Sequence, residues 1–174
     1  MKSFRCTICG EVHIGDKRPS NCPFCGVAER YIMDFENVKG EGLFTVKSLS
    51  DESRKNLMVA LNLETSNASF YKCASEKSES ENMRALFKRL AKVEREHADT
   101  IRKYLDLDKI EFNNEECSDL DQMNVEDAMG REKSALEFYR NSAKEAKEPK
   151  ISNFFMAISE VEEGHLKVLK KSEN

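Results

Sequence analysis

The chain lacks three features that would place it in common functional classes. It has no surplus of basic charge, because 28 lysines and arginines face 32 aspartates and glutamates, for a formal net charge of -4. This balance argues against a nucleic-acid-binding protein. It also has no apolar run long enough to cross a bilayer, and its first residues, MKSFRCTICG, lack the apolar stretch of a signal peptide. We therefore expect a soluble, cytoplasmic protein.

Proline is scarce and the cysteines are unevenly placed. Two of the three prolines and four of the six cysteines fall within residues 1–36, where helical periodicity is weak. From about Ser50 onward, long apolar-periodic segments alternate with polar turns. The sequence predicts a small loop-rich module at 1–36, a linker at 37–50 and a helical bundle at 51–174.

The bundle is predicted to contain four helices, at about 51–75, 79–105, 125–147 and 149–171. Ser50 and Asn124 are the expected N-caps of the first and third helices, and Pro149 stands in the first turn of the fourth. The connection at about 106–124 is long and polar, and an extended chain of that length can run along a whole bundle. This favours a mainly α, ferritin-like bundle with a crossover over a simple up-down arrangement.

The sequence Val-Glu-x-x-His occurs twice, at 93–97 and at 161–165, which is a shift of 68 residues. The same shift aligns further identical pairs: Glu64 with Glu132, Tyr71 with Tyr139, and Phe87 with Phe155. In each half the lone glutamate precedes the Glu-x-x-His by 30 residues. Two helix hairpins of one design are therefore predicted.

The repeated glutamates and histidines predict a metal centre. Glu and His three residues apart project from one helix face, so both can reach one interior site. Four carboxylates facing one core would repel each other unless cations neutralise them. One Glu from each of two helices and a Glu-x-x-His from each of the other two form the ligand set of di-iron and di-manganese bundles. The predicted ligands are Glu64, Glu94, His97, Glu132, Glu162 and His165.

Not every residue near these positions is expected to bind metal. A single Glu-x-x-His is more often a solvated helix face, but six matched positions in one register favour ligands. The neighbouring Glu96 aligns with Gly164, so we do not expect it to bind metal. Tyr71 and Tyr139 lie two turns beyond the lone glutamates, either as core tyrosines or as hydrogen-bond donors to ligand carboxylates. We include both among the candidate catalytic residues.

The N-terminal module carries Cys-x-x-Cys-Gly at 6–10 and Cys-Pro-x-Cys-Gly at 22–26. Each pair is typical of a metal knuckle, in which the following glycine allows the required backbone angles. Two such pairs make a four-thiolate site that suits either zinc or a single iron. Cys73, on the face of the first helix opposite the ligands, and Cys117, in the crossover, are expected to be incidental thiols.

Together these motifs resemble the rubrerythrin family, in the domain order of the reverse rubrerythrins, and the resemblance covers nearly the whole chain. It implies a rubredoxin-like module that holds one iron on Cys6, Cys9, Cys22 and Cys25. It implies that the six bundle ligands hold a non-haem di-iron centre.

The resemblance also implies an activity. Such proteins are peroxidases that reduce hydrogen peroxide to water, a defence against oxidative stress in anaerobes. Their electrons come from NADH through a partner reductase or rubredoxin. The resemblance further implies a head-to-tail homodimer, in which the thiolate iron of one chain serves the bundle of the other.

One position departs from the family pattern. Ordinary rubrerythrins carry an extra Glu one turn after the third-helix ligand, and here that position is Ala135. The redox-linked ligand exchange associated with that carboxylate is therefore not expected. Two other functions stay open: a ferroxidase or iron-storage unit, and a structural or regulatory metalloprotein with zinc on its cysteines.

Overall fold

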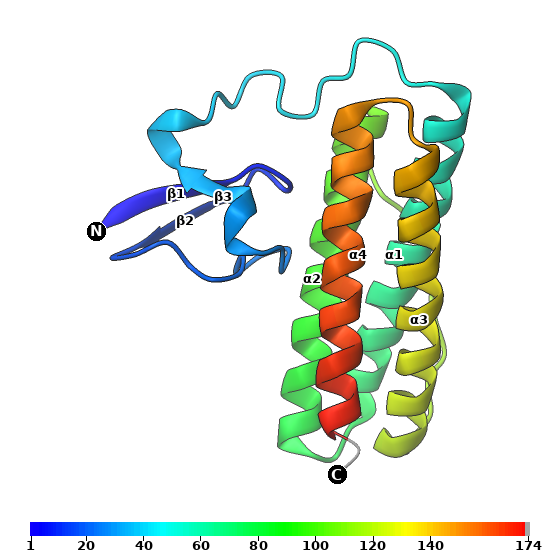
Figure 1. Cartoon of the computed structure of the whole chain (residues 1–174). Helices are drawn as coiled ribbons and strands as arrows, with labels where there is room; N and C mark the ends of the chain where they lie inside the picture. Colours follow the sequence, from blue (N-terminus) through cyan, green and yellow to red (C-terminus); the bar gives the residue numbers. More distant parts are fainter. Residues whose placement is uncertain (173–174) are drawn as a thin grey trace.

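The computed structural model describes residues 1–172 and places a small β module beside a helical bundle (Figure 1). The described residues form four α-helices: α1 (Asp51–Lys77), α2 (Glu81–Leu105), α3 (Asp121–Glu145) and α4 (Pro149–Ser172). The prediction of a mainly α, ferritin-like bundle is confirmed, with helix ends displaced by no more than about one turn. Residues 173–174 of the expected bundle lie outside the described part. Among residues 1–172, no helix is long and apolar enough to cross a membrane.

The helices pair as two hairpins, α1 with α2 and α3 with α4, as the repeat predicts. Serine caps shape the first hairpin. Ser50 accepts a hydrogen bond from the backbone N–H of Ser53 at 3.3 Å, which confirms the predicted cap of α1. Ser80 caps α2 in the same way, by accepting from the N–H of Met83. Each cap provides an acceptor for a backbone N–H that has no partner within its helix.

The start of α3 differs from the prediction. The helix begins at Asp121, and Leu120 rather than Asn124 occupies the N-cap position. The Asn124 amide folds back on the preceding loop, where it donates to the carbonyl of Ser118 and accepts from its N–H, both at 2.9 Å. Asn124 therefore closes the end of the crossover instead of capping the helix.

The crossover, residues 106–120, runs along the bundle from the end of α2 to the start of α3 (Figure 1). Because it spans the bundle, α2 and α3 point the same way, which is the ferritin-like connection.

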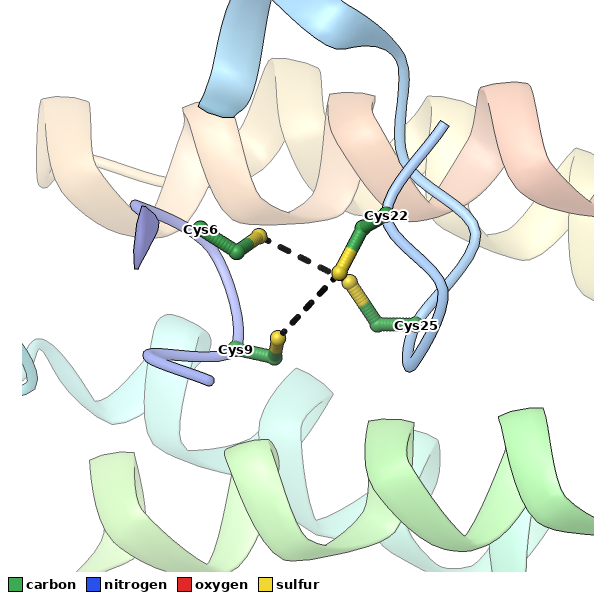
Figure 2. Close-up of side chains that lie close together, drawn as sticks. All are labelled: Cys6, Cys9, Cys22 and Cys25. Carbon is green, nitrogen blue, oxygen red and sulfur yellow. Dashed lines mark hydrogen bonds between the residues drawn. The ribbon is translucent and has the colours of Figure 1, made fainter. Parts of the chain in front are cut away.

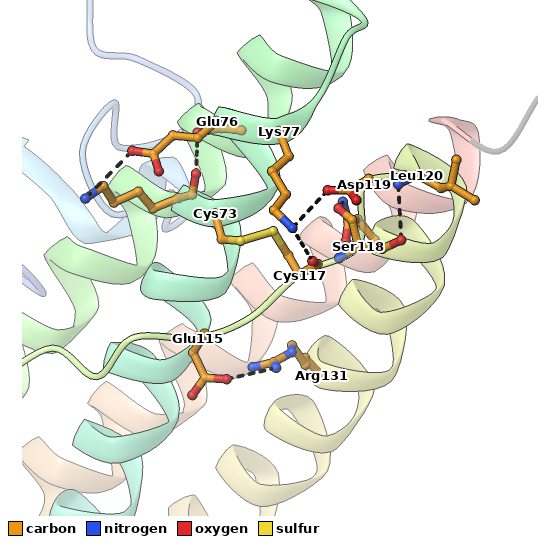
Figure 3. The surroundings of a disulfide bond; sticks show 12 residues. Cys73, Glu76, Lys77, Glu115, Cys117, Ser118, Asp119, Leu120 and Arg131 are labelled. Carbon is orange, nitrogen blue, oxygen red and sulfur yellow. Dashed lines mark hydrogen bonds and ion pairs between the residues drawn. A yellow bond between two sulfur atoms is a disulfide. The ribbon is translucent and has the colours of Figure 1, made fainter.

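A disulfide ties this crossover to α1. Cys117 is bonded to Cys73, with 5.9 Å between their Cα atoms (Figure 3). The prediction of two incidental thiols was therefore wrong. Cys73 does lie on the outer side of α1, but that is the side along which the crossover passes. Lys77 strengthens the attachment by donating to the carbonyl of Cys117 at 3.0 Å and pairing with Asp119 at 2.9 Å.

The N-terminal module is built on an antiparallel sheet of β1 (Lys2–Cys6), β2 (Val12–Gly15) and β3 (Ile32–Asp34), in the order β2-β1-β3 within the described residues. Short 3-10 turns, η1 (Glu29–Tyr31) and η2 (Phe35–Asn37), flank β3. One cysteine pair begins at the end of β1, and the other lies in the loop between β2 and η1. The sheet therefore brings the two knuckles to one end of the module.

The module packs against the bundle of its own chain. One hydrophobic cluster contains Ile8 and Val27 of the module together with Tyr104, Phe154 and Val161 of the bundle. The contact is close at Gly26, where a Cβ would lie 2.9 Å from Val161 Cγ1. Arg30 and Glu160 form an ion pair at the edge of the contact. This packing fixes the position of the cysteine site over α2 and α4.

Candidate metal centres

The four knuckle cysteines converge on one point (Figure 2). The Sγ atoms of Cys6 and Cys25 are 3.8 Å apart, and so are those of Cys9 and Cys22. A tetrahedron with metal–sulfur bonds of about 2.3 Å has edges of roughly 3.8 Å. The sulfur positions therefore fit a four-coordinate metal ion, and this spacing suits zinc and iron alike.

Both knuckles close in the same way. The N–H of Gly10 donates to the carbonyl of Cys6, and the N–H of Gly26 to that of Cys22, each at 3.0 Å. Gly10 and Gly26 have φ angles of 85° and 80°. This left-handed backbone is strained for residues with a side chain, so the predicted role of the two glycines is confirmed.

The buried thiols conflict with one another when no cation binds them. Hydrogen bonds with Cys22 raise the pKa of Cys9 and also that of Cys25, whereas the other three sulfurs lower the pKa of Cys22. Protons are therefore held on some sulfurs at the expense of others. A metal ion that binds four thiolates removes this conflict.

The second centre lies inside the bundle. All six predicted ligands are at most 8% exposed. Within residues 1–172 their ligand atoms form two overlapping sets, in each of which the atoms lie within 4.8 Å of one another. One set is Glu64, Glu94, His97 and Glu162, and the other is Glu94, Glu132, Glu162 and His165. Since Glu94 and Glu162 belong to both sets, they are the carboxylates that two bound ions would share.

Both imidazoles turn Nδ1 toward the carboxylates. Nδ1 of His97 lies 3.4 Å from Glu64, 3.1 Å from Glu94 and 3.5 Å from Glu162. Nδ1 of His165 lies 3.2 Å from Glu94, 3.4 Å from Glu132 and 3.1 Å from Glu162. A nitrogen that carries one proton cannot satisfy three acceptors, whereas a cation can be shared among them.

Unpaired oxygens support the same conclusion. One carboxylate oxygen each of Glu64, Glu94, Glu132 and Glu162 is buried and accepts no hydrogen bond in the described part of the chain. Buried oxygens without a partner are uncommon in native proteins, and a bound ion is one of the accepted reasons for them. Four in one cluster fit two metal ions held between them.

Burial and crowding shift the pKa values of these groups. Burial, and next the charge of Glu94, raise the pKa of Glu64 to about 8. The same causes hold the pKa of Glu162 well above its usual range. Burial opposes charging of both histidines, but Glu64 raises the pKa of His97 and Glu132 that of His165. The metal-free centre therefore binds protons where the loaded centre would bind cations.

The two tyrosines pair with the glutamates across the halves. The hydroxyl of Tyr71 on α1 donates to Glu132 on α3, and that of Tyr139 on α3 donates to Glu64 on α1. Burial, followed by the charge of these carboxylates, keeps the pKa of each phenol well above its usual range, so both remain proton donors. Of the two roles considered from the sequence, the structure shows donors to the predicted ligand carboxylates.

Neighbouring residues stay outside the two ligand sets. Among the described residues, Glu96 belongs to neither set. Ala135 is buried at 1% exposure and supplies no ligand atom where ordinary rubrerythrins carry their extra Glu.

One functional contact was missed by sequence reasoning. Nε2 of His97 lies 2.9 Å from the backbone carbonyl of Cys25. Because a carbonyl only accepts, Nε2 carries the proton and leaves Nδ1 free to bind a metal, a common arrangement for a histidine ligand. No sequence pattern announces this contact, because it joins two modules through residues 72 positions apart.

Known proteins share both parts of the chain. The family model described as "Rubrerythrin" matches residues 55–173, and that described as "Rubrerythrin, rubredoxin-like domain" matches residues 4–32. The curated protein Reverse rubrerythrin-1 of Clostridium acetobutylicum is 26% identical over a match of 107 residues, and the match covers 56% of this chain and 59% of the relative. The match thus spans less than two thirds of that relative. A solved structure of a hypothetical protein from Pyrococcus furiosus is similar in fold, with 22% identity, a TM-score of 0.61, and coverage of 70% of this chain and 87% of that one.

Proposed function

The chain belongs to the rubrerythrin family, and from this premise we propose that it is a non-haem di-iron peroxidase that reduces hydrogen peroxide to water. The observation that carries the proposal is the bundle centre, with its two overlapping ligand sets and two shared glutamates. Family membership supports an oxidoreductase with iron sites. Peroxide as the substrate, NADH as the distant electron source and protection from oxidative stress in the cytoplasm belong to this proposal.

Two irons in the bundle and one on the cysteines would supply the redox chemistry that converts one peroxide, two protons and two electrons into two waters. The protein must hold these ions apart from bulk water, and the burial of all six bundle ligands supports that role.

The tyrosines position the glutamates that are not shared. Glu64 and Glu132 each lie in one ligand set, and each accepts a hydrogen bond from a tyrosine of the opposite half. This bond holds one carboxylate oxygen of each glutamate, and the other oxygen is buried without a hydrogen-bond partner in the described part of the chain. Burial raises the pKa of both phenols, so each keeps its proton and remains a hydrogen-bond donor beside the site.

The contact between His97 and Cys25 supports an electron path within one chain. The carbonyl of Cys25, a residue of the thiolate site, accepts a hydrogen bond from Nε2 of His97. The other nitrogen of the same imidazole, Nδ1, faces the bundle centre. The sequence led us to expect transfer between the chains of a head-to-tail homodimer. The homodimer stays a prediction, and we propose that electrons move within each chain.

The experiment is metal analysis of the iron-loaded protein, with its visible spectrum and its consumption of peroxide under anaerobic reducing conditions. We expect three irons per chain, a red colour that bleaches on reduction, and two electrons consumed per peroxide. Zinc on the cysteines of a colourless protein would favour the structural or regulatory alternative. Growth of a mineral iron core in preference to peroxide turnover would favour iron storage.

A further inference from the structure

A stripe of basic side chains covers the outer face of α2. Between Met83 and Arg95 the only carboxylate is Glu94, which is fully buried in the bundle centre. The basic side chains of this segment are all exposed, and they are Arg84, Lys88, Arg89, Lys92 and Arg95. The segment is therefore strongly positive at the surface of a chain whose net charge is -4.

These residues line two adjoining hollows, which we name the basic groove. The first, of 420 Å³, lies between α1 and α2, and Lys72 of α1 joins four residues of the stripe there. The second, of 450 Å³, shares Lys92 and Arg95 with the first and reaches Pro23 and Phe24 of the module. Six basic side chains line the two hollows, and only two carboxylates, those of Glu76 and Glu96, lie among the lining residues.

Few of these positive charges are neutralised nearby. Lys72 pairs with Glu76 at 3.7 Å, but Lys88 and Lys92 form no ion pair with any described residue. Charges that a protein leaves unpaired on one face attract oppositely charged partners and speed their association.

The groove ends at the accessible side of the cysteine site. The four cysteines are at most 3% exposed, so a donor outside the protein does not reach their sulfurs directly. The tip of the first knuckle is closed, because Ile8 is 2% exposed within the shared core. The tip of the second knuckle is open, because Pro23 is exposed and Phe24 only half-buried. Arg89 of the stripe donates to the carbonyl of Pro23 at 2.6 Å.

We propose that the basic groove is the docking site of a small acidic electron-carrier protein, which delivers electrons through the Pro23–Phe24 tip. The inference rests on the proposed function and adds to it the surface at which the electron donor binds. Each encounter moves one electron: the reduced group of the carrier, such as a flavin hydroquinone, becomes a semiquinone, and the ferric thiolate site becomes ferrous. Two encounters supply one peroxide. Electrons enter beside Cys22 and leave at Cys25.

The test compares two charge reversals of equal size in the iron-loaded full-length chain. Lys88→Glu with Lys92→Glu alters the groove, and Lys133→Glu with Lys144→Glu alters exposed lysines on α3. The probe is an acidic flavin-containing carrier. Calorimetry with the oxidised carrier measures binding, and stopped-flow absorption with the reduced carrier measures bleaching of the thiolate site.

We expect the groove variant to bind at least about tenfold more weakly at low ionic strength and to be reduced correspondingly more slowly, with the difference shrinking at high salt. The α3 variant should bind within about twofold of the original chain, since its reversed charges lie away from the groove. A small uncharged reductant should bleach the thiolate site of every variant at one rate, which shows that the site itself is intact.

Equal binding by the two variants would overturn the proposal. So would a single-stranded polynucleotide that binds the groove, with loss of binding in the Lys88→Glu, Lys92→Glu variant, while the carrier does not bind. A chain that accepts electrons from the docked carrier but leaves peroxide unconsumed would instead reject the peroxidase proposal and leave the docking site standing.

Discussion

At the scale of single residues, the two tyrosines have a role that the repeat alone did not reveal. The 68-residue shift aligned Tyr71 with Tyr139 but left their role open between core packing and hydrogen bonding. The structure resolves this, because each hydroxyl reaches a glutamate that only the folded bundle brings beside it. Helical periodicity places a residue on a face, and it leaves open which side chain of another helix lies opposite.

Replacing both tyrosines tests their positioning role. The Tyr71→Phe, Tyr139→Phe variant should keep both irons of the bundle centre but reduce peroxide roughly ten- to a hundredfold more slowly, because Glu64 and Glu132 lose the bonds that orient them. Tyr104→Phe is the matched control, since Tyr104 is buried but donates to neither carboxylate. Steady-state peroxide consumption and the ligand-field spectrum of the loaded protein measure the effect. Wild-type turnover in the double variant would show that the hydroxyls are packing groups only.

The raised pKa of Glu64 predicts how the metal-free protein responds to pH. A carboxyl whose pKa rises from 4.5 to about 8 on folding favours the folded state at low pH, and that contribution is lost as pH climbs through this window. Glu162, His97 and His165, whose pKa values are also raised, act in the same direction. Glu94, held below its usual pKa mainly by His165 despite its burial, acts in the opposite direction.

The melting temperature of the metal-free chain should therefore fall between pH 5 and pH 8, and Glu64→Gln should flatten the decline. Thermal unfolding followed by circular dichroism in the presence of a chelator measures it. Stability that rises over this range would contradict the arrangement of the buried carboxylates. Loading with metal should remove most of the trend, because the cations replace the protons.

At the scale of elements, the caps show what sequence predicts well and where it fails. Ser50 begins α1 as expected, because its second partner, Glu148, accepts from the hydroxyl at 3.4 Å and leaves the serine oxygen free to accept from the N–H of Ser53. Asn124 looked equally suited to begin α3, but its amide is occupied by both backbone groups of Ser118. An asparagine side chain can cap a helix or can bond the backbone of a nearby loop. The path of the crossover, which the sequence does not reveal, decides which of the two Asn124 does.

The disulfide was missed for a related reason. Cys73 and Cys117 are 44 residues apart, and their pairing depends on which face of α1 the crossover covers. The six side chains that cluster at the bundle centre, by contrast, could all be identified from the sequence, because the internal repeat supplies two independent copies of one pattern.

Removing this disulfide should destabilise the bundle by releasing the crossover. Under oxidising conditions, Cys117→Ser should lower the free energy of unfolding by about 2–4 kcal/mol, because the unfolded chain regains the freedom of the loop that the bond closes. Urea denaturation with and without a thiol reductant measures it. In the reductant the variant and the original chain should unfold together. A difference that persists there would assign the loss to packing at position 117 and not to the covalent bond.

At the scale of the whole molecule, the main feature is that the cysteine module packs against the bundle of its own chain. Separate patterns predicted the two metal sites, but neither contained the surface that joins them, which is made of Ile8, Val27, Tyr104 and Val161. That surface brings Cys25 to His97 and leaves the second knuckle open toward the basic groove. In the proposed function, electrons would enter at the second knuckle, pass from Cys25 to His97 and reach the buried centre within one chain.

Mixed assemblies separate transfer within a chain from transfer between chains. One parent carries Cys9→Ala with Cys25→Ala, and the other carries Glu94→Ala with Glu162→Ala. If electrons move within each chain, co-assembled mixtures should show no more peroxidase activity than the two parents alone, because no chain has both sites. Recovery of a substantial part of the original activity, with mixed dimers verified by mass spectrometry, would instead support the exchange between subunits that the family resemblance suggested.

The most direct test of the central claim, that the thiolate site feeds the buried carboxylate centre for peroxide reduction, is a single rapid-mixing measurement. The fully reduced, iron-loaded chain is mixed with excess hydrogen peroxide, and the absorption of the ferric thiolate site is followed. In the original chain the red colour should return quickly. In Glu94→Ala, Glu162→Ala the thiolate site should still bind iron but regain its colour at least about a hundredfold more slowly, because its electrons have no metal centre to reach. Return of the colour at the original rate in that variant would contradict the account, because peroxide would then be oxidising the thiolate site directly.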